Sequence, residues 1–326
     1  MERSSAVIKV ILAIISPIVF FGFLEIATRA FWRYEVTDSH VGVVPEETNR
    51  EFLHDHIIYK TNSHGIRYRE IDPIAPTNRR ILALGDSFVW GSGLPEETLV
   101  TTKIEKILES QLPGILVVNA GICGYNTEDE YEQLLRLAPI YQPDHVLLFF
   151  FTNDVLAKKE GGKRRNKYMS WKQNLKEYLR HKSKFCALCY YLYKTRYAAR
   201  IGVPRTLLPS DYFNLDQSKP GWVAFKKALL DVRDYCKEND ISLQFIIIPT
   251  LTCLNANYPY AELHGKVKDF SASCGIPTVD LLPVFAPYEP AELWVNPENT
   301  HWNDTTTSIA AEAIVRQFND IEFIRK

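Results

Sequence analysis

The sequence lacks an excess of charge of either sign. It has 38 Lys and Arg against 39 Asp and Glu, which gives a formal net charge of −1. Such a chain has no overall electrostatic attraction to nucleic acid or to an anionic membrane, so any charge-based binding must be local. Internal repeats and low-complexity tracts are also absent. Because 46% of the 326 residues are hydrophobic, the chain can bury a full core, which excludes a disordered or fibrous protein.

Cysteine is too sparse for a fold held together by disulfides. The six cysteines are scattered over a chain that is large enough to build a core without them. Cys186 and Cys189 form one CxxC pair, but a structural zinc site would need a second ligand pair at matching spacing. His54 and His56 also have no further ligands nearby in the sequence. We therefore expect no metal site, and we expect the CxxC cysteines to be buried on a helix.

One long uncharged run stands at the N-terminus. Residues 10–24 contain no charge, and counting from residue 6 gives a nineteen-residue run with one lysine, close to the ~20 apolar residues that cross a bilayer. A cleaved signal peptide is the alternative, but Arg29 makes the segment 27–30 a poor small-residue cleavage site. We predict that residues 1–34 form an uncleaved membrane anchor. Basic residues flank the run on both sides, so its orientation stays open.

The segment that follows, residues 35–78, is polar, contains three prolines and shows no sustained periodicity. We interpret it as a linker that then wraps the main domain. Within it, the turn-like stretch 62–70 suggests no chemistry from its spacing.

The main domain, residues 79–322, alternates short apolar runs with helical patterns. The runs are continuously apolar, which favours strands covered on both faces, and they lie at 81–86, 115–121, 145–154, 242–249 and 276–281. Helical patterns lie at 96–111, 127–140, 219–238, 259–273 and 304–318. This alternation predicts a doubly wound α/β fold with a parallel sheet. We expect Asn303 or Asp304 to cap the last helix.

Polar residues follow the first three predicted strands at the point where each strand ends. Ser87 follows the first, Gly124 the second and Asn153 the third. In parallel sheets, ligands gather outside the carboxyl ends of the strands. His301 lies on a loop between the last strand and the last helix, from which it could reach the same edge. We therefore expect these four residues to meet at one site.

These residue types suit attack on a carbonyl carbon. A serine hydroxyl attacks poorly until a base takes its proton, and histidine has the pKa that suits this task at neutral pH. Ser87 and His301 could form that pair. The negative charge that then develops on the carbonyl oxygen needs preorganised donors. The backbone N–H groups of Ser87 and Gly124 and the side-chain amide of Asn153 could supply them.

Four short motifs now resemble a known family. "GDS" after the first strand, "NAGICG" after the second, "TND" after the third and the late His301 are similar to the signature blocks of the SGNH hydrolases, also called the GDSL lipase/acylhydrolase family. The resemblance implies an α/β/α sandwich with a five-stranded parallel sheet, of flavodoxin-like type. It implies Ser87 as nucleophile, His301 as general base, and Ser87, Gly124 and Asn153 as the oxyanion hole. The G-x-S-x-G elbow of the α/β-hydrolases is absent, because Val89 stands where it needs glycine.

Two positions depart from the family pattern. The third block usually begins with glycine, where this chain has Phe151. The family's acid normally sits three residues before the histidine, and Glu298 occupies that position here. By the resemblance, Glu298 would orient the imidazole. Asn299 comes next, and an asparagine in that role could hold the geometry without stabilising the charged ring.

A basic stretch follows the third strand, within a predicted insertion at 155–218. Residues 155–184 contain eleven Lys or Arg against two Glu. Such a run is usually a solvated surface. A sharper hypothesis is a cap over the active site that touches anionic lipid headgroups, since each Lys or Arg near an acidic bilayer contributes ~1 kcal/mol. No nucleic-acid-binding module surrounds these residues, so we expect no nucleic-acid partner.

The sequence therefore predicts a membrane-anchored serine esterase that works through an acyl-enzyme and needs no cofactor. Its substrate would be an ester of a lipid or of an acylated cell-envelope carbohydrate. The resemblance places its catalytic domain outside the inner membrane of a bacterium. Two alternatives stay open. One is an O-acyltransferase that uses the same residues, and the other is an envelope-binding protein that keeps the fold without turnover.

Overall fold

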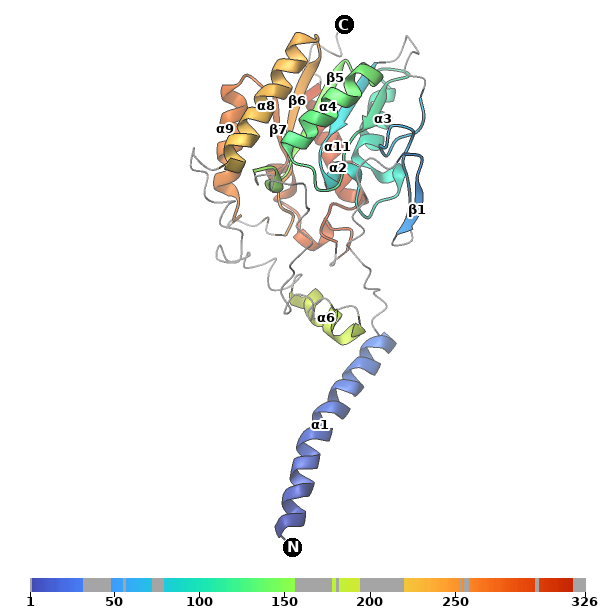
Figure 1. Cartoon of the computed structure of the whole chain (residues 1–326), viewed down its shortest axis with the longest axis vertical. Coiled ribbons are helices and arrows are strands. Elements are labelled where there is room, and N and C mark those ends of the chain that lie inside the picture. Colours follow the sequence, from blue (N-terminus) through green and yellow to red (C-terminus); the bar gives the residue numbers. More distant parts are fainter. Residues whose placement is uncertain are drawn as a thin grey trace.

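The computed structural model of the 326-residue chain contains a five-stranded parallel sheet between helices, preceded by a long N-terminal helix (Figure 1). The residues that the structure describes are 2–31, 48–54, 57–71, 79–155, 178–179, 182–193, 220–252, 254, 258–296 and 299–318.

The central sheet has the strand order β4-β3-β5-β6-β7, and every neighbouring pair is parallel. Its strands are β3 (Arg80–Leu84), β4 (Leu116–Asn119), β5 (His145–Phe150), β6 (Ser242–Ile247) and β7 (Thr278–Asp280). Each coincides with one of the five apolar runs, with β3 beginning one residue before its run, so the predicted α/β fold with a five-stranded parallel sheet is confirmed. The order places β3 between β4 and β5, and the loops that follow these three strands lie next to one another.

Helices cover both faces of this sheet. On one face α3 packs on α11, and on the other α4 packs on α8, beside which α9 lies (Figure 1). The bounds are α3 (Val100–Glu109), α4 (Thr127–Tyr141), α8 (Pro220–Glu238), α9 (Ala261–Ser273) and α11 (Asp304–Phe318). Asn303 caps α11 as predicted, because its Oδ1 accepts the Thr306 N–H at 3.0 Å. Shorter helical segments are α2 (Ser87–Trp90), η1 (Glu96–Thr98), η2 (Thr152–Val155), α10 (Leu282–Phe285) and η6 (Pro290–Glu292).

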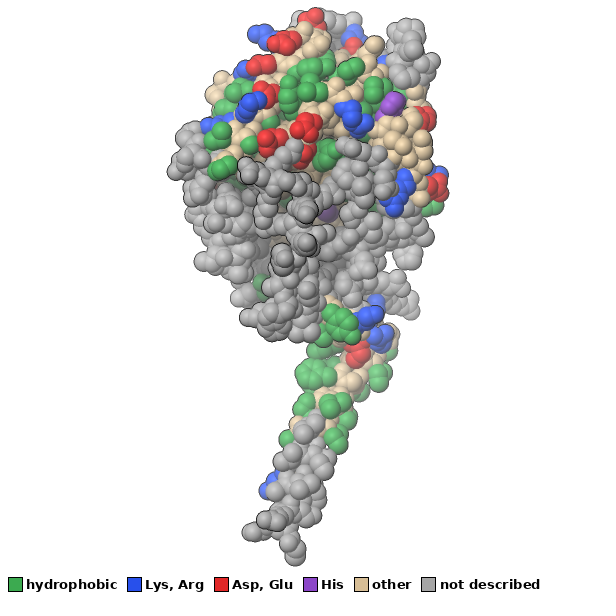
Figure 2. Space-filling view, viewed as in Figure 1, with side chains coloured by type: hydrophobic (Ala, Val, Ile, Leu, Met, Phe, Trp, Pro, Cys, Tyr) green, Lys and Arg blue, Asp and Glu red, His purple; other side chains and the backbone are tan. Residues whose placement is uncertain are grey.

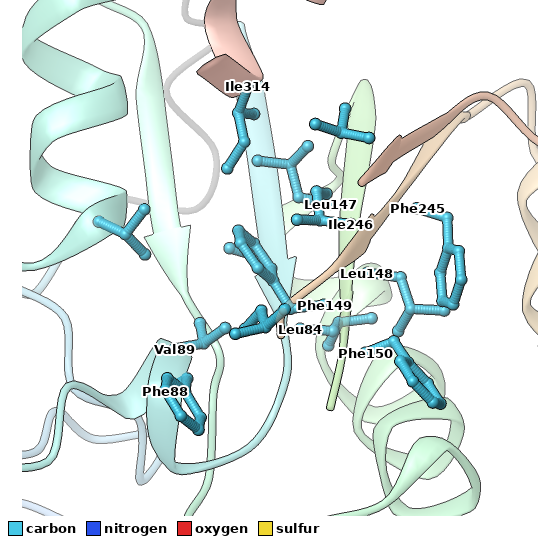
Figure 3. Close-up of a cluster of buried hydrophobic side chains, with 14 of the residues drawn as sticks. Leu84, Phe88, Val89, Leu147, Leu148, Phe149, Phe150, Phe245, Ile246 and Ile314 are labelled. Atoms are coloured by element: carbon cyan, nitrogen blue, oxygen red, sulfur yellow. The ribbon is translucent and has the colours of Figure 1, made fainter. Parts of the chain in front are cut away.

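The core explains why the strands are continuously apolar. Every residue of β3 and of β5 is buried, as expected for strands with helices on both faces. Figure 3 shows Phe88 and Val89 of α2 beside Leu84 and Phe149 of the sheet. Phe88 is 4% exposed and Val89 is fully buried. The residues after Ser87 are therefore embedded in the core, which holds the serine in place.

The N-terminal helix is α1 (Glu2–Phe31). Among the described residues, no helix is both long and apolar enough to cross a membrane, so the predicted transmembrane helix is not confirmed. Within the predicted linker, β1 (Glu51–His54) and β2 (Ile57–Lys60) form an antiparallel pair that the sequence analysis did not predict.

Most of the predicted insertion at 155–218, including most of its basic stretch, lies outside the described residues. Its described helix is α6 (Lys184–Leu192), which packs against α1. Cys186 and Cys189 lie on this helix as free thiols. The prediction of buried cysteines is wrong, because Cys189 is exposed and Cys186 is only half-buried.

Candidate active site

Ser87 begins α2, a four-residue helix at the end of β3. Asp86 caps the helix because its Oδ1 accepts the Phe88 N–H at 2.9 Å. The helix ends at Gly91 in the left-handed conformation, with φ of 81°. The chain therefore leaves the sheet, makes one turn and reverses, so Ser87 stands at the carboxyl edge of the sheet with its side chain half-buried.

Side chains from other parts of the chain hold the carbonyl groups of this nucleophile turn. Trp302 Nε1 donates to Phe88 O at 3.0 Å, and Asn119 Nδ2 donates to Val89 O at 2.9 Å. The Arg67 guanidinium donates to three more carbonyl oxygens, those of Trp90 at 3.0 Å, Gly91 at 2.8 Å and Leu94 at 2.6 Å. These bonds tie the turn to β4, to the histidine loop and to the segment before β3.

Arg67 is a site residue that the sequence analysis missed. It is only 2% exposed, and its guanidinium lies 4.4 Å from the centre of the Tyr59 ring. All three of its described bonds to the turn go to backbone oxygens. Since every residue has such an oxygen, the sequence contains no side-chain pattern that would identify the partners of Arg67. The stretch 62–70, to which no chemistry was assigned, thus supplies the clamp on the nucleophile turn.

The structure brings His301 to Ser87 as predicted. The distance from His301 Nε2 to Ser87 Oγ is 2.7 Å, although the two residues are 214 positions apart in the sequence. The Phe88 ring packs against the imidazole, with 4.8 Å between ring centres. The other ring nitrogen of His301, Nδ1, lies 2.5 Å from Asn299 Oδ1.

The tautomer of His301 follows from these contacts. Asn299 Nδ2 donates to Ser92 O at 3.2 Å, so Oδ1 is the amide atom that faces the imidazole. An amide oxygen only accepts hydrogen bonds, so His301 Nδ1 must carry the proton. Nε2 is then free to accept the Ser87 hydroxyl proton. The pair is arranged for general-base activation of the serine.

Glu298, the predicted orienting acid, lies outside the described residues. The described group that bonds His301 Nδ1 is the neutral Asn299. The family spacing pointed to position 298, and the only sequence signal for Asn299 was that it is the next polar residue.

Burial lowers the pKa of His301 to about 4, because the charged ring is poorly solvated there. The base is effective only when neutral, so we expect kcat/KM for a small ester to persist well below pH 6 and to fall to half near pH 4. An imidazole with the ordinary pKa would place the acid limb of kcat/KM at about pH 6.5. A pH profile of kcat/KM, with circular dichroism as a check on folding, tests this. An acid limb at or above pH 6.5 would contradict it.

The predicted oxyanion donors lie on the two neighbouring loops. Gly124 has a φ of 77°, and a Cβ built on it would meet nothing within 4 Å. Its backbone is strained for any other residue, and the space beside it is open. Asn153 lies in η2, and its Nδ2 donates to Tyr125 O, next to Gly124, over a long 3.4 Å. The Asn153 side chain also hydrogen-bonds the Asp86 carboxyl group, which helps to hold the amide beside the nucleophile turn.

We expect Asn153→Ala to lower kcat by about 10²- to 10³-fold, because one oxyanion donor contributes ~2.7–4 kcal/mol of transition-state stabilisation. KM should change little, since the charge develops only in the transition state. Steady-state kinetics on a small ester measures both. A loss of less than about fivefold in a variant with unchanged thermal stability would remove Asn153 from the oxyanion hole.

Three buried carboxyl groups, Asp86, Asp154 and Glu130, lie on the segments that carry the site or in the adjoining α4. Burial raises the pKa of Asp86 to about 6, and burial together with neighbouring carboxylates raises the pKa values of Asp154 and Glu130 well above their usual range. Asp154 Oδ2 accepts from Thr127 Oγ1 at 3.2 Å and from Phe151 N at 3.3 Å. Asp154 thus holds η2, and with it Asn153, to α4.

A serine, a histidine in the correct tautomer and nearby amide donors at the carboxyl edge of a parallel sheet define a serine hydrolase. Its family is shown by sequence comparison, in which residues 83–309 match the model of the GDSL-like lipase/acylhydrolase family. The chain belongs to this family and is a serine hydrolase that acts on ester bonds. A search of curated proteins finds no matching relative.

Solved structures with a similar fold include three enzymes, each 15% identical to this chain. A lipase/acylhydrolase from Enterococcus faecalis has a TM-score of 0.44, with 74% of this chain and 96% of that one covered. A psychrotrophic esterase from Pseudoalteromonas sp. has a TM-score of 0.44, with 74% and 97% covered. A catalytic mutant of an acetylxylan esterase from Geobacillus stearothermophilus has a TM-score of 0.46, with 76% and 97% covered.

Proposed function

We propose that the protein cleaves an ester of a lipid or of an acylated cell-envelope carbohydrate through an acyl-enzyme on Ser87. The contact of 2.7 Å between Ser87 Oγ and the unprotonated Nε2 of His301 supports the acyl-enzyme step, and the substrate class rests on the family resemblance. In the first step, Ser87 Oγ bonds to the carbonyl carbon while its proton moves to His301. The charge on the carbonyl oxygen meets the N–H groups of Ser87 and Gly124 and the amide of Asn153.

The tetrahedral intermediate then collapses, and His301 returns the proton to the leaving alcohol as the carbon–oxygen ester bond breaks. In the second step, His301 takes a proton from water, whose oxygen attacks the acyl carbon, and the proton returns to Ser87 as the free acid leaves. No step needs a metal or an organic cofactor.

The test is rapid-mixing kinetics with p-nitrophenyl acetate, combined with intact mass after acid quenching. The proposal expects a burst of p-nitrophenol, a mass increase of one acetyl group and steady release of acetate. A burst with almost no turnover, in which added acylatable glycans speed the release and become acetylated, would favour the O-acyltransferase. The absence of both a burst and turnover would favour the envelope-binding protein.

We also propose that α1 attaches the enzyme to a membrane, with the catalytic domain outside the bacterial inner membrane. Support comes from the described side chains of α1, of which nine large apolar ones are exposed, among them Phe20, Phe23 and Phe31 (Figure 2). Burying such a side chain contributes ~1.5–3 kcal/mol. The full chain should sediment with membranes, and a chain without residues 1–34 should stay in the supernatant. The proposal would be contradicted if the full and the shortened chain were found in the membrane fraction in equal proportion.

A further inference from the structure

The side-chain amide of Asn299 bonds in two directions at once. Its Oδ1 lies 2.5 Å from His301 Nδ1, and its Nδ2 donates to Ser92 O at 3.2 Å. Ser92 belongs to the chain reversal that follows Ser87. One planar group therefore touches both the base and the turn that carries the nucleophile.

We propose that Asn299 is the positioning residue of the catalytic pair, fixing the His301 tautomer and joining the histidine loop to the nucleophile turn, and that this double task requires an amide. The proposal rests on the esterase function proposed above. It assigns the orienting role to a neutral side chain, in place of the carboxylate three residues before the histidine.

The loop holds Asn299 in the position that this role needs. The Asn299 N–H donates to Asn296 Oδ1 at 2.7 Å, and the Asn296 N–H donates back to Asn299 O at 3.2 Å. The Val295 N–H donates to His301 O at 2.9 Å, so the two arms of the loop are paired. These bonds fix the backbone of Asn299 and so place its side-chain amide between His301 and Ser92.

The nucleophile turn is shaped to receive the amide. Gly93 has a φ of 87°, and a Cβ on this residue would lie 2.4 Å from Asn299 Nδ2. Only glycine lets the amide approach Ser92 O here. The Gly93 N–H donates to the Tyr59 hydroxyl oxygen at 2.8 Å, which holds this part of the turn in place.

An aspartate at position 299 could do only half of this task. One carboxylate oxygen would accept from His301 Nδ1 as the amide oxygen does. The other would face the Ser92 carbonyl oxygen at about the 3.2 Å of the present bond, where two oxygens without a proton repel each other. An amide has one acceptor and one donor in the same plane, which matches the two partners.

The neutral partner also has an electrostatic consequence. Within the described part of the chain, burial is the one cause that shifts the pKa of His301, and no carboxylate there stabilises its charged form. Asp86, beside Ser87, is the neighbouring titratable group on the turn. Among the described residues no carboxylate bonds the ring, so a carboxylate introduced at 299 would add an opposite charge there, which favours the imidazolium.

The experiment compares full-length wild type with Asn299→Ala, Asn299→Asp and Glu298→Gln, with Asn303→Ala as the matched control. Asn303 lies on the same loop and donates to Glu292 O and Trp294 O, but none of its described bonds reaches His301. ¹⁵N NMR of labelled histidine reports the His301 tautomer and its titration, with His301→Gln used for assignment. This readout does not need turnover.

We expect a single Nδ1–H tautomer in wild type, Glu298→Gln and Asn303→Ala, and a mixture in Asn299→Ala with kcat lowered about 10- to 100-fold and little change in KM. Asn299→Asp should move the His301 titration and the acid limb of kcat/KM upward by about one pH unit or more. Its plateau kcat should nevertheless stay below wild type, because the bond to Ser92 is lost.

Other results would overturn the proposal. One is an unchanged His301 tautomer in Asn299→Ala. A second is a plateau kcat in Asn299→Asp that equals or exceeds that of wild type. A third is a loss of kcat or of the single tautomer in Glu298→Gln that Asn299→Ala does not show. Should Asn299→Ala fail to fold, Asn299→Asp has the same shape as the native residue and provides both readouts. If wild type shows no turnover that depends on Ser87, the proposed function fails, and the NMR comparison still decides the role of Asn299.

Discussion

Replacing Ser87 with alanine will lower kcat for a small ester on the order of 10⁵- to 10⁶-fold, with the fold intact. The residue is the only described group that the histidine base contacts through Nε2, at 2.7 Å, so without it no covalent step can begin. What activity remains would come from the oxyanion donors acting on a water molecule. The measurement is steady-state kinetics at high enzyme concentration, with thermal unfolding as the folding check.

Ser92→Ala is the matched control for this variant. Ser92 lies on the same turn, but its hydroxyl faces the Cys123 thiol at 3.4 Å, and its contact with Asn299 uses the backbone carbonyl. We expect this variant to keep its kcat within about threefold of wild type, because no catalytic bond is lost. Equal losses in Ser87→Ala and Ser92→Ala would mean that the turn matters and the Ser87 hydroxyl does not.

His301→Gln is the second variant with a large expected loss, on the order of 10⁴-fold or more in kcat. Glutamine keeps a polar group near Ser87 and Asn299, but it cannot take the Ser87 proton at neutral pH. The residual rate should rise with pH, since hydroxide and the ionised serine then substitute for the missing base. Kinetics between pH 5 and 10 measure this, in a range where wild type stays on its plateau.

His64→Gln provides the comparison, because its ring packs on Tyr141 with 5.5 Å between ring centres, and none of its described bonds reaches Ser87 or His301. It should keep the wild-type pH profile. If His301→Gln also kept the wild-type rate and acid limb, a different group would be the base, and the tautomer argument would have no catalytic meaning.

The sheet could be predicted from the sequence because its strands are buried on both faces. β5 is the clearest case, since six consecutive buried residues leave an apolar run that no surface strand would show. Once the strands were assigned, the rule that sites form at their carboxyl ends predicted that Ser87, Asn153 and Gly124 would be neighbours. The contact of His301 with Ser87 was predicted by the same reasoning and is confirmed by the structure.

Other features leave little trace in the sequence. The antiparallel pair β1 and β2 consists of two four-residue strands, too short for a periodic pattern to be distinguished from a loop. Arg67 bonds backbone carbonyls, which every residue possesses, so its partners cannot be recognised from side-chain types. The contact of Asn299 with His301 depends on where one loop bends, and the polar residues before the histidine give no periodic signal for that.

The central claim is that Ser87 is a nucleophile activated by His301, and the most direct measurement is peptide mapping of the full chain after reaction with a fluorophosphonate. Phosphorus bonds to an activated serine oxygen as fluoride leaves, so the adduct marks the nucleophile. The account predicts one modified peptide, with the adduct on Ser87, and at least a hundredfold slower labelling in His301→Gln. An unlabelled chain, an adduct on another residue, or labelling of Ser87 at the same rate without His301 would contradict it.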